Sequence, residues 1–203
     1  MGSNQYYKNK ALESLEGNWG TAAIATLIIA IISGGVSSVA TIPFGNDFAT
    51  GMGINSIWSL LCLPLQWGFT VFFLNLIRKE DIRYERLFDG YKDFVRVFLM
   101  EFLYIIAVMI GICLLIIPGI ILTIGLMMAP YILKDDQEIS AMDALKKSWE
   151  MTKGHKMKLF WLGLSFIGWV ILSLMTLGIG FFFLAPYVDT TFAHYYEEEL
   201  KAA

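Results

Sequence analysis

Long apolar runs alternate with charged segments along this chain. Residues 21–42 and 55–77 are each close to the roughly 20 apolar residues that a membrane-spanning helix needs. Residues 97–133 contain a single charged residue, Glu101, and residues 159–188 contain none. Charged residues concentrate between these runs, in segments 78–96 and 134–158. The pattern predicts membrane-spanning helices separated by segments that face water.

The two later apolar runs are too long for one spanning helix, so a reversal is expected within each. Proline removes a backbone donor and glycine loosens a helix, which places the turns at Pro118-Gly119 and at Thr-Leu-Gly-Ile-Gly, 176–180. We therefore predict three helical hairpins, at about 21–77, 94–134 and 157–196. Full crossing is favoured because a lipid-exposed turn in the hydrocarbon leaves backbone groups unpaired. A hairpin that re-enters halfway leaves the same charges on the same side, and this alternative stays open.

The hairpins share a sequence pattern. Ala-Pro-Tyr occurs at 129–131 and at 185–187, and Pro64 takes the matching place in the first hairpin. An amphipathic segment with apolar residues at helical spacing precedes each hairpin, and each segment leads to a glycine. The apolar residues are Leu12, Leu15 and Trp19, then Tyr84, Leu87, Phe88 and Tyr91, then Met142, Leu145 and Trp149; the glycines are Gly17, Gly90 and Gly154.

The predicted fold class is all-α, a polytopic membrane protein with six transmembrane helices. These helices form three hairpins in parallel pseudo-repeat, with a short amphipathic cytoplasmic helix before each hairpin. A single integral membrane domain is expected to cover residues 1–203. Ser140 and Asp143, three residues apart, predict the start of the amphipathic helix before the third hairpin.

Composition supports this interpretation. Of 203 residues, 57% are hydrophobic and 16% are charged, whereas a soluble domain carries about a quarter charged residues. The net charge of −3 argues against a nucleic-acid partner, because the chain has no excess of Lys and Arg to replace the counterions of the phosphates. Cys62 and Cys113 both lie in apolar runs and suit small core residues, so neither a disulfide nor a metal site is expected.

The placement of Lys and Arg predicts the orientation. Of the 15 basic residues, two precede the first span, six lie in 78–96, six in 134–158, and the last is Lys201. None lies at 43–54, 117–119 or 176–180, where the hairpins are expected to turn. Cytoplasmic loops retain Lys and Arg. Both termini and the charged segments are therefore expected to be cytoplasmic.

Several motifs resemble the bacterial integral-membrane family known as domain of unknown function DUF975. The matching pieces are Gly154-His155-Lys156, Leu-Ser-Phe-Ile-Gly-Trp at 164–169, Thr-Leu-Gly-Ile-Gly at 176–180 and Pro186-Tyr187. Further support comes from Glu-Ser-Leu-Glu-Gly-Asn-Trp at 13–19 and from residues 138–148. The resemblance covers nearly the whole chain and implies a multi-pass protein of the bacterial inner membrane. It implies no activity, so no functional residue is carried over.

Three polar residues in or near the predicted spans are candidates for function: Asp189, Glu101 and His194. An ionisable group inside a membrane is costly and is read as functional by default. The alternative for Asp189 is a position at the cytoplasmic edge, paired with Lys158 or Arg96. The alternative for Glu101 is an interfacial ion pair with Arg96, in place of a role in proton transfer.

Basic residues beneath the third and fifth predicted helices are candidates for binding lipid headgroups. They are Lys153, Lys156, Lys158, Arg83, Arg86, Lys92 and Arg96. Acidic residues in the same segments weaken their field, so topology signals together with snorkelling of the long side chains are the favoured explanation. Too few ligands converge in the pattern for zinc, and neither a cofactor nor a metal is predicted.

Three functions are compatible with the sequence. The first, which the sequence favours, is a non-enzymatic membrane scaffold that binds itself or another membrane protein or organises lipid. The second is a small transporter or exporter of an amphipathic or lipid-like solute, with a cavity lined by Asp189 and Glu101. The third is an enzyme on lipid headgroups that uses Asp189, His194 and His155, which requires these groups to lie within hydrogen-bond reach. The sequence shows no catalytic motif, so we expect a non-enzymatic protein.

Overall fold

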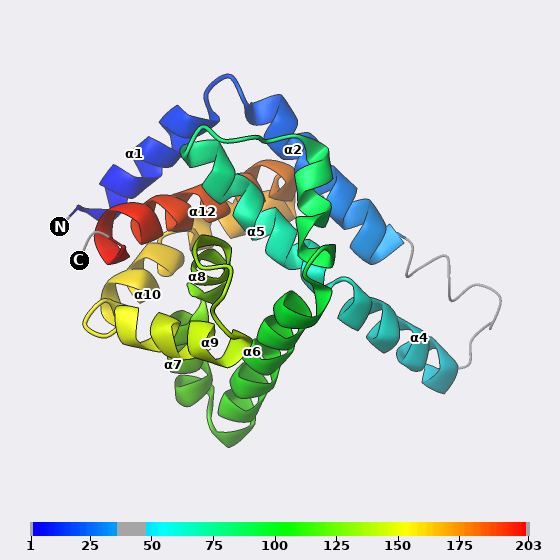
Figure 1. Cartoon of the computed structure of the whole chain (residues 1–203). Coiled ribbons are helices and arrows are strands. Elements are labelled where there is room, and N and C mark those ends of the chain that lie inside the picture. Colours follow the sequence, from blue (N-terminus) through cyan, green and yellow to red (C-terminus); the bar gives the residue numbers. More distant parts are fainter. Residues whose placement is uncertain (1, 36–47, 202–203) are drawn as a thin grey trace.

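A computed structural model describes residues 2–35 and 48–201, and every element in these ranges is helical (Figure 1). The α-helices are α1 (Asn4–Leu15), α2 (Trp19–Ala30), α4 (Phe48–Leu61), α5 (Leu63–Ile77), α6 (Phe94–Leu114), α7 (Ile116–Leu126), α8 (Ala129–Asp135), α9 (Ala141–Met151), α10 (Lys156–Leu164), α11 (Ile167–Met175) and α12 (Phe181–Tyr195). A π-helical turn, Ile31–Gly35, continues α2, and another, Tyr196–Leu200, continues α12. A 3₁₀ helix, Tyr84–Tyr91, precedes α6.

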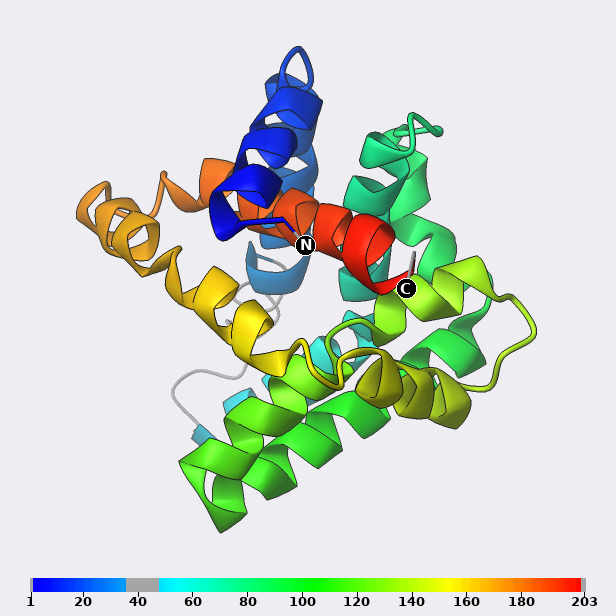
Figure 2. The ribbon, with the colours of Figure 1, turned by 90° about the vertical axis from the view of Figure 1, so that its left-hand side faces the viewer.

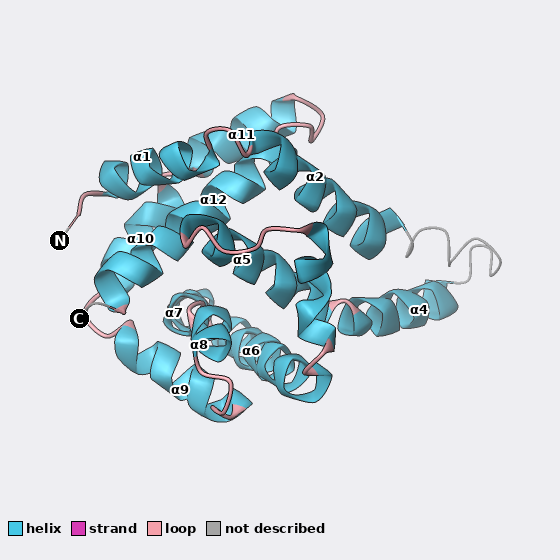
Figure 3. Ribbon diagram, turned by 45° about the horizontal axis from the view of Figure 1, so that its top comes forward, coloured by secondary structure: helices cyan, strands magenta, loops and turns pink. Residues whose placement is uncertain are grey.

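Helix α5 forms the centre of the fold (Figures 1 and 3). It is apolar on nearly all sides, and most of its side chains from Leu63 to Leu76 are buried. A helix of this composition must be covered all round. The cover comes from α2, α6, α8, α12 and the 3₁₀ helix. A Cβ at Gly68 would lie 2.0 Å from the carbonyl oxygen of Leu87, so the 3₁₀ helix packs directly on the backbone of α5.

The outer helices expose apolar side chains. On α6 only Val97, Met100 and Gly111 are buried, and Leu177 in the turn before α12 is 96% exposed. Large exposed apolar surfaces of this kind indicate contact with a membrane. Phe94–Leu114, Ile116–Asp135 and Lys156–Met175 are each long and apolar enough to cross one.

By length and composition the described residues therefore provide three candidate spans. The number rises to five when two bent helix pairs are each taken as one span. The pairs are α1 with α2 and its π-helical turn, bent by 95°, and residues 52–61 of α4 with α5, bent by 42°. An all-helical membrane protein is thus supported, whereas six spans in a hairpin repeat stay a prediction.

The predicted turn of the second hairpin lies three residues too late. Helices α6 and α7 pack against each other, and the chain reverses at Leu115, whose backbone is extended. Pro118 instead occupies the first turn of α7, where a missing N–H costs nothing. Close packing at Gly111 and Gly119 brings the two helices together, since a Cβ at Gly111 would meet the backbone of Gly119 at 3.0 Å.

The predicted turn of the third hairpin is confirmed. Helix α11 ends at Met175 and α12 begins at Phe181, so residues 176–180 form the connection. Leu177 and Gly178 both have positive φ angles, 54° and 89°, which lets the chain reverse within five residues. The predicted span at 55–77 is bent, because Pro64 starts a new helix after Cys62, and the bent pair of helices together is long and apolar enough to count as one span. The expected first turn falls partly on residues 36–47, outside the described residues.

The amphipathic segments before the three predicted hairpins form α1, the 3₁₀ helix and α9. Ser140 accepts a hydrogen bond from the N–H of Asp143, which confirms the predicted start of α9. Gly17 and Gly154 follow α1 and α9 with similar φ angles of 79° and 82°, whereas Gly90 permits close packing on Pro64. The sequence pattern therefore corresponds to shared geometry at two of its three glycines.

Candidate functional site

Polar side chains from four helices line one cavity of about 190 Å³. They are Gln66 and Thr70 of α5, Glu101 and Tyr104 of α6, Tyr131 of α8 and Asp189 of α12. These helices meet around the central α5, so residues far apart in sequence face one space. Apolar and aromatic side chains, among them Phe192, complete the wall.

The two carboxyl groups at the cavity have no fixed partner. Neither Glu101 nor Asp189 has a hydrogen bond or an ion pair with another described residue, and both stay partly exposed. The charge of Asp189 acts on Tyr131, and that of Glu101 acts on Tyr104, so each carboxyl lies near a phenol. An unpaired carboxylate among apolar helices favours either a proton or a cation.

The ion pairs considered for these carboxyls are not present among the described residues. Arg96 pairs with Asp93 at 2.6 Å, and Lys158 lies 3.6 Å from Glu199. Neither base reaches Asp189 or Glu101. The expectation of an interfacial pair between Arg96 and Glu101 is therefore wrong, because the guanidinium of Arg96 is turned toward the end of α8.

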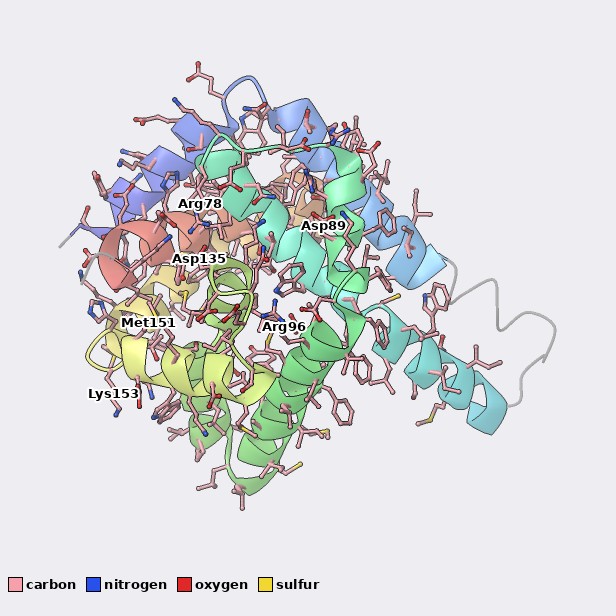
Figure 4. All side chains as sticks on the ribbon, viewed as in Figure 1. Arg78, Asp89, Arg96, Asp135, Met151 and Lys153 are labelled. Carbon is pink, nitrogen blue, oxygen red and sulfur yellow. The ribbon has the colours of Figure 1, made fainter. Side chains whose placement is uncertain are left out.

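Arg96 binds the chain that follows α8 (Figure 4). Its guanidinium donates hydrogen bonds to the carbonyl oxygens of Leu133, Asp136, Gln137 and Ile139. Leu133 lies in the last turn of α8, where carbonyls have no partner within the helix, and the other three acceptors lie in the connection after α8. Arg96 thus positions α8, which carries Tyr131 at the cavity.

His194 lies in a second polar cluster, between α1 and α12. Its Nε2 is 2.8 Å from the Oγ of Ser14, and its Nδ1 is 3.3 Å from the carboxylate of Glu198. The same carboxylate accepts a hydrogen bond from Lys10 at 2.7 Å. A hydroxyl, an imidazole and a carboxylate in this order resemble the arrangement of a serine hydrolase.

The backbone around Ser14 does not suit acyl transfer. Catalysis of that kind needs free N–H groups to stabilise an oxyanion. Ser14 lies within α1, and the N–H groups of Glu16 and Asn18 donate to the carbonyls of Leu12 and Leu15. We interpret the cluster as a connection that holds α1 to α12.

His155 has another partner, the hydroxyl of Tyr195 at 2.9 Å. Asp189, His194 and His155 therefore have separate surroundings: the cavity, the α1–α12 contact and Tyr195. The described residues contain no group of three His, Cys, Asp or Glu side chains that could hold a metal ion. Cys62 is buried and Cys113 is exposed.

Three successive glutamates after α12 connect distant helices. Glu197 pairs with Arg78 at the end of α5 at 2.5 Å, and Glu198 pairs with Lys10 of α1. Glu199 accepts hydrogen bonds from Tyr7 and from the N–H of Gly2. Arg78 also binds Asp135, so α5, α8 and the segment after α12 meet at one guanidinium (Figure 4). Figure 2 shows the N-terminal helix beside the C-terminal segment.

Most of the candidate headgroup residues have carboxylate partners. Arg83 and Arg86 pair with Asp81, Lys92 pairs with Asp89, and the pairs of Arg96 and Lys158 are given above. Lys153 and Lys156 differ, since neither has an ion pair with another described residue. The Nζ of Lys156 instead lies 2.8 Å from the centroid of the Trp149 ring.

Sequence reasoning identified both carboxyls at the cavity but missed its other polar residues. Gln66 and Thr70 lie one turn apart on α5, a spacing that places both on one face of a helix. Tyr131 belongs to the repeated Ala-Pro-Tyr, which was interpreted only as a repeat marker. No pattern in the sequence signalled the cluster of Ser14, His194 and Glu198, because Ser14 lies 180 residues from His194.

Comparison with known proteins supports the resemblance found in the motifs. The family model described as "Protein of unknown function (DUF975)" matches residues 1–123 and 99–203, which together cover the whole sequence. No curated protein and no solved structure matches the chain. This chain therefore belongs to the DUF975 family.

Proposed function

We propose that this chain is a small, non-enzymatic membrane carrier that binds an organic cation in the cavity around α5 and exchanges it for protons. The observation that carries the proposal is the convergence of Glu101 and Asp189, from different helices, on one cavity. Of the functions compatible with the sequence, transport of an amphipathic solute fits this arrangement best.

The chemistry of the wall favours a cation over other solutes. Two carboxyl groups supply negative charge, and Tyr104, Tyr131 and Phe192 add aromatic surface, which attracts cations through the ring face. No Lys or Arg lines the cavity among the described residues, so nothing there neutralises the carboxylates. A volume of about 190 Å³ limits the solute to a small molecule.

Exchange for protons follows from the surroundings of the carboxyls. An isolated carboxylate among apolar helices is stabilised by either a proton or a cation, so we infer that the two compete for the carboxyls of the cavity. When a cation enters, its charge compensates the carboxylates and their protons leave to water. Release of the cation then requires the protons to return. A proton gradient would therefore drive the cation in the opposite direction.

We further infer the setting of this activity from the charge distribution and the family resemblance. The protein would lie in a bacterial inner membrane as a multi-pass protein, with both termini in the cytoplasm. The arrangement proposed is six transmembrane helices in three hairpins. A scaffold that assembles with itself or with another membrane protein is the competing function, and no contact among the described residues specifically favours it.

A direct test is flux in reconstituted vesicles, with tetramethylammonium as the probe and an imposed pH gradient. Vesicles that contain wild-type protein are expected to accumulate the probe when protons flow outward, because cation and protons move in opposite directions. Asp189→Asn and Glu101→Gln should each reduce the rate at least tenfold, because the bound cation then loses one of the two carboxylates that compensate its charge. Glu138→Gln removes an equal charge from an exposed connection and serves as the control.

The proposal fails if both cavity variants transport the probe at the wild-type rate. It also fails if wild-type protein neither binds nor moves any of a series of small amines. Binding measured by calorimetry in detergent separates these outcomes from a defect of reconstitution. Asp189→Leu adds a further check, since a carrier that tolerates it has no need of the carboxyl.

A further inference from the structure

The lipid-facing surface holds an apolar groove between α7 and α10, with a cavity volume of about 300 Å³. Its walls are Ile117, Ile120, Ile121 and Ile124 of α7 with Met157 and Phe160 of α10. Ile117 and Met157 are 70% and 67% exposed, so the groove is open along its side. The residue that completes the lining is Lys156.

The groove runs along α7 toward one cationic end. Ile117 and Ile124 lie seven residues apart, which is about 10 Å along a helix. This length is about two-thirds of one leaflet of a bilayer core that is roughly 30 Å thick. Gly125 follows Ile124, and a Cβ there would meet the ring of Trp149 at 2.3 Å and the Nζ of Lys156 at 3.3 Å. Glycine at this position therefore lets Trp149 and Lys156 close the end of the groove.

The positive charge at this end is not compensated within the described chain. Lys153 lies in the exposed turn after α9, pointing outward in Figure 4, and its charge acts on Lys156. Neither ammonium has a carboxylate partner among residues 2–35 and 48–201. Lys158, the next base along α10, is not one of these uncompensated cations, because Glu199 lies 3.6 Å away.

A neighbouring groove differs from this one in the charges at its edge. It lies among α6, α7 and α9 and is also almost wholly apolar, but both Lys146 and Glu150 lie at its edge. Lys146 pairs with Asp143 in addition. Charge of both signs there gives an anion no preferred place. The groove at α7 and α10 differs because the charged residue in its lining, Lys156, has no carboxylate partner among the described residues.

We propose that the groove between α7 and α10 binds one anionic phospholipid, with an acyl chain along the isoleucines of α7 and the phosphate against Lys153 and Lys156. The apolar walls match the chain, and the two ammonium groups match the headgroup. Trp149 lies at the boundary between them, where tryptophan is commonly found in membrane proteins. This lipid site is independent of the carboxyl-lined cavity and of the proposed transport.

Native mass spectrometry of the purified full chain tests the site. The probes are phosphatidylglycerol and phosphatidylcholine with identical acyl chains, and the quantity is the dissociation constant of the first bound lipid. Wild-type protein is expected to prefer phosphatidylglycerol. Lys153→Gln combined with Lys156→Gln should weaken phosphatidylglycerol binding about thirtyfold and leave phosphatidylcholine unchanged, from the usual contribution of two basic residues near a lipid surface.

Lys153→Gln alone keeps the contact of Lys156 with Trp149 and should weaken binding about fivefold. Arg83→Gln with Lys92→Gln is the matched control, since it removes the same charge from exposed residues that pair with Asp81 and Asp89. The control should change binding by less than about threefold, because only a diffuse field is altered.

Ile117→Trp tests the groove without changing charge. Its indole should block the channel and weaken phosphatidylglycerol about tenfold, since several buried methylene groups lose their contacts. Inorganic phosphate should not compete, because it lacks the chain. The proposal is overturned if wild-type protein shows no preference, if the control pair loses as much affinity as the lysine pair, or if Ile117→Trp leaves the affinity unchanged.

Discussion

The hydroxyl of Tyr7 donates a hydrogen bond to the carboxylate of Glu199, although 192 residues separate them in sequence. Tyr7 is 1% exposed, and its ring lies 5.0 Å from that of Tyr195. Burial raises the pKa of Tyr7, and the bond to Glu199 raises that pKa further, so the phenol stays a donor across the physiological range. The first helix is thereby held to the segment after the last one.

Removing this hydroxyl should destabilise the fold. Tyr7→Phe leaves a partly buried carboxylate with one donor fewer, and a hydrogen bond to a charged group contributes about 2 kcal/mol. We expect a lower Tm in mild detergent, by about 6 °C for a chain of this size. Tyr84→Phe is the control, because the hydroxyl of Tyr84 has no hydrogen bond with another described residue. Equal Tm values for the two variants would contradict the role assigned to Tyr7.

Acid should loosen the contact between α1 and the segment after α12. Burial opposes ionisation of Glu198, but hydrogen bonds from Lys10 and Tyr6 outweigh it, so the pKa of Glu198 lies below its ordinary value of 4.5. A carboxyl with a lowered pKa stabilises the fold above its unfolded pKa, and this stability is lost as pH falls through its folded pKa. Tm should therefore decrease below pH 4.5.

The variant Lys10→Gln isolates this effect. Without Lys10 the pKa of Glu198 returns toward or above its ordinary value, so the variant should be less stable than wild type at neutral pH. The difference in Tm should shrink as pH falls from about 6 to about 3, because the wild-type ion pair is lost in acid. Thermal unfolding across this range is the measurement. A constant difference would exclude the ion pair as its source.

Two helical glycines should respond oppositely to alanine. Gly68→Ala places a methyl group 2.0 Å from the carbonyl oxygen of Leu87, which is backbone and cannot rotate away. Overpacking of this kind costs about 3 kcal/mol, so Tm should fall clearly. Gly168→Ala meets nothing within 4 Å and should be neutral or stabilise α11 by up to about 1 kcal/mol. Similar Tm changes for both would mean that the 3₁₀ helix does not lie on α5 in solution.

Arg96 should protect the end of α8 from hydrogen exchange. Its planar guanidinium reaches several carbonyls beyond Leu133, which the single ammonium of lysine cannot do. Arg96→Lys is expected to increase exchange selectively in residues 131–139, measured by mass spectrometry, while α10 keeps its protection. Unchanged exchange in 131–139 would show that the guanidinium is not needed there.

Single thiols report the orientation of the second hairpin. The structure has the turn of this hairpin at Leu115, and the placement of Lys and Arg predicts that the turn lies outside the cell and Lys153 in the cytoplasm; both side chains are exposed. In a chain lacking Cys62 and Cys113, a membrane-impermeant maleimide added to intact cells should label Leu115→Cys and spare Lys153→Cys. The reverse result would invert the proposed topology. Labelling of both only after lysis would favour a re-entrant hairpin.

Sequence patterns predicted local features of this fold better than its packing. The turn at 176–180 and the start of α9 at Ser140 follow from residue chemistry that acts over a few positions, and both are confirmed. The reversal of the second hairpin was predicted three residues too late. Proline is tolerated in the first turn of a helix, so Pro118 does not show whether the chain reverses before or after the proline. The apolar segment 55–77 was predicted as a membrane span, but its part in α5 is covered by other helices, because composition does not distinguish lipid from a protein interior as the neighbour of a helix.

The candidate site was predicted in part for the same reason. Glu101 and Asp189 stand out as charges in apolar runs, a local property of the sequence. Their meeting at one cavity depends on how α6 and α12 pack around α5, which no local pattern specifies. The partners expected for them were wrong because Arg96 and Lys158 find closer acceptors in Asp93 and Glu199.

The distance in sequence between Tyr7 and Glu199 sets a waiting time during biosynthesis. At a usual rate of about 5–20 residues per second, a ribosome needs about 10–40 s to reach the partner of the first helix. During this interval the face of α1 that carries Tyr7 and Lys10 has been synthesised but lacks its partners Glu199 and Glu198. Chaperones and proteases can reach it during that time. Slowed translation should therefore reduce the yield of this protein more than that of one whose first helix pairs with its sequence neighbour.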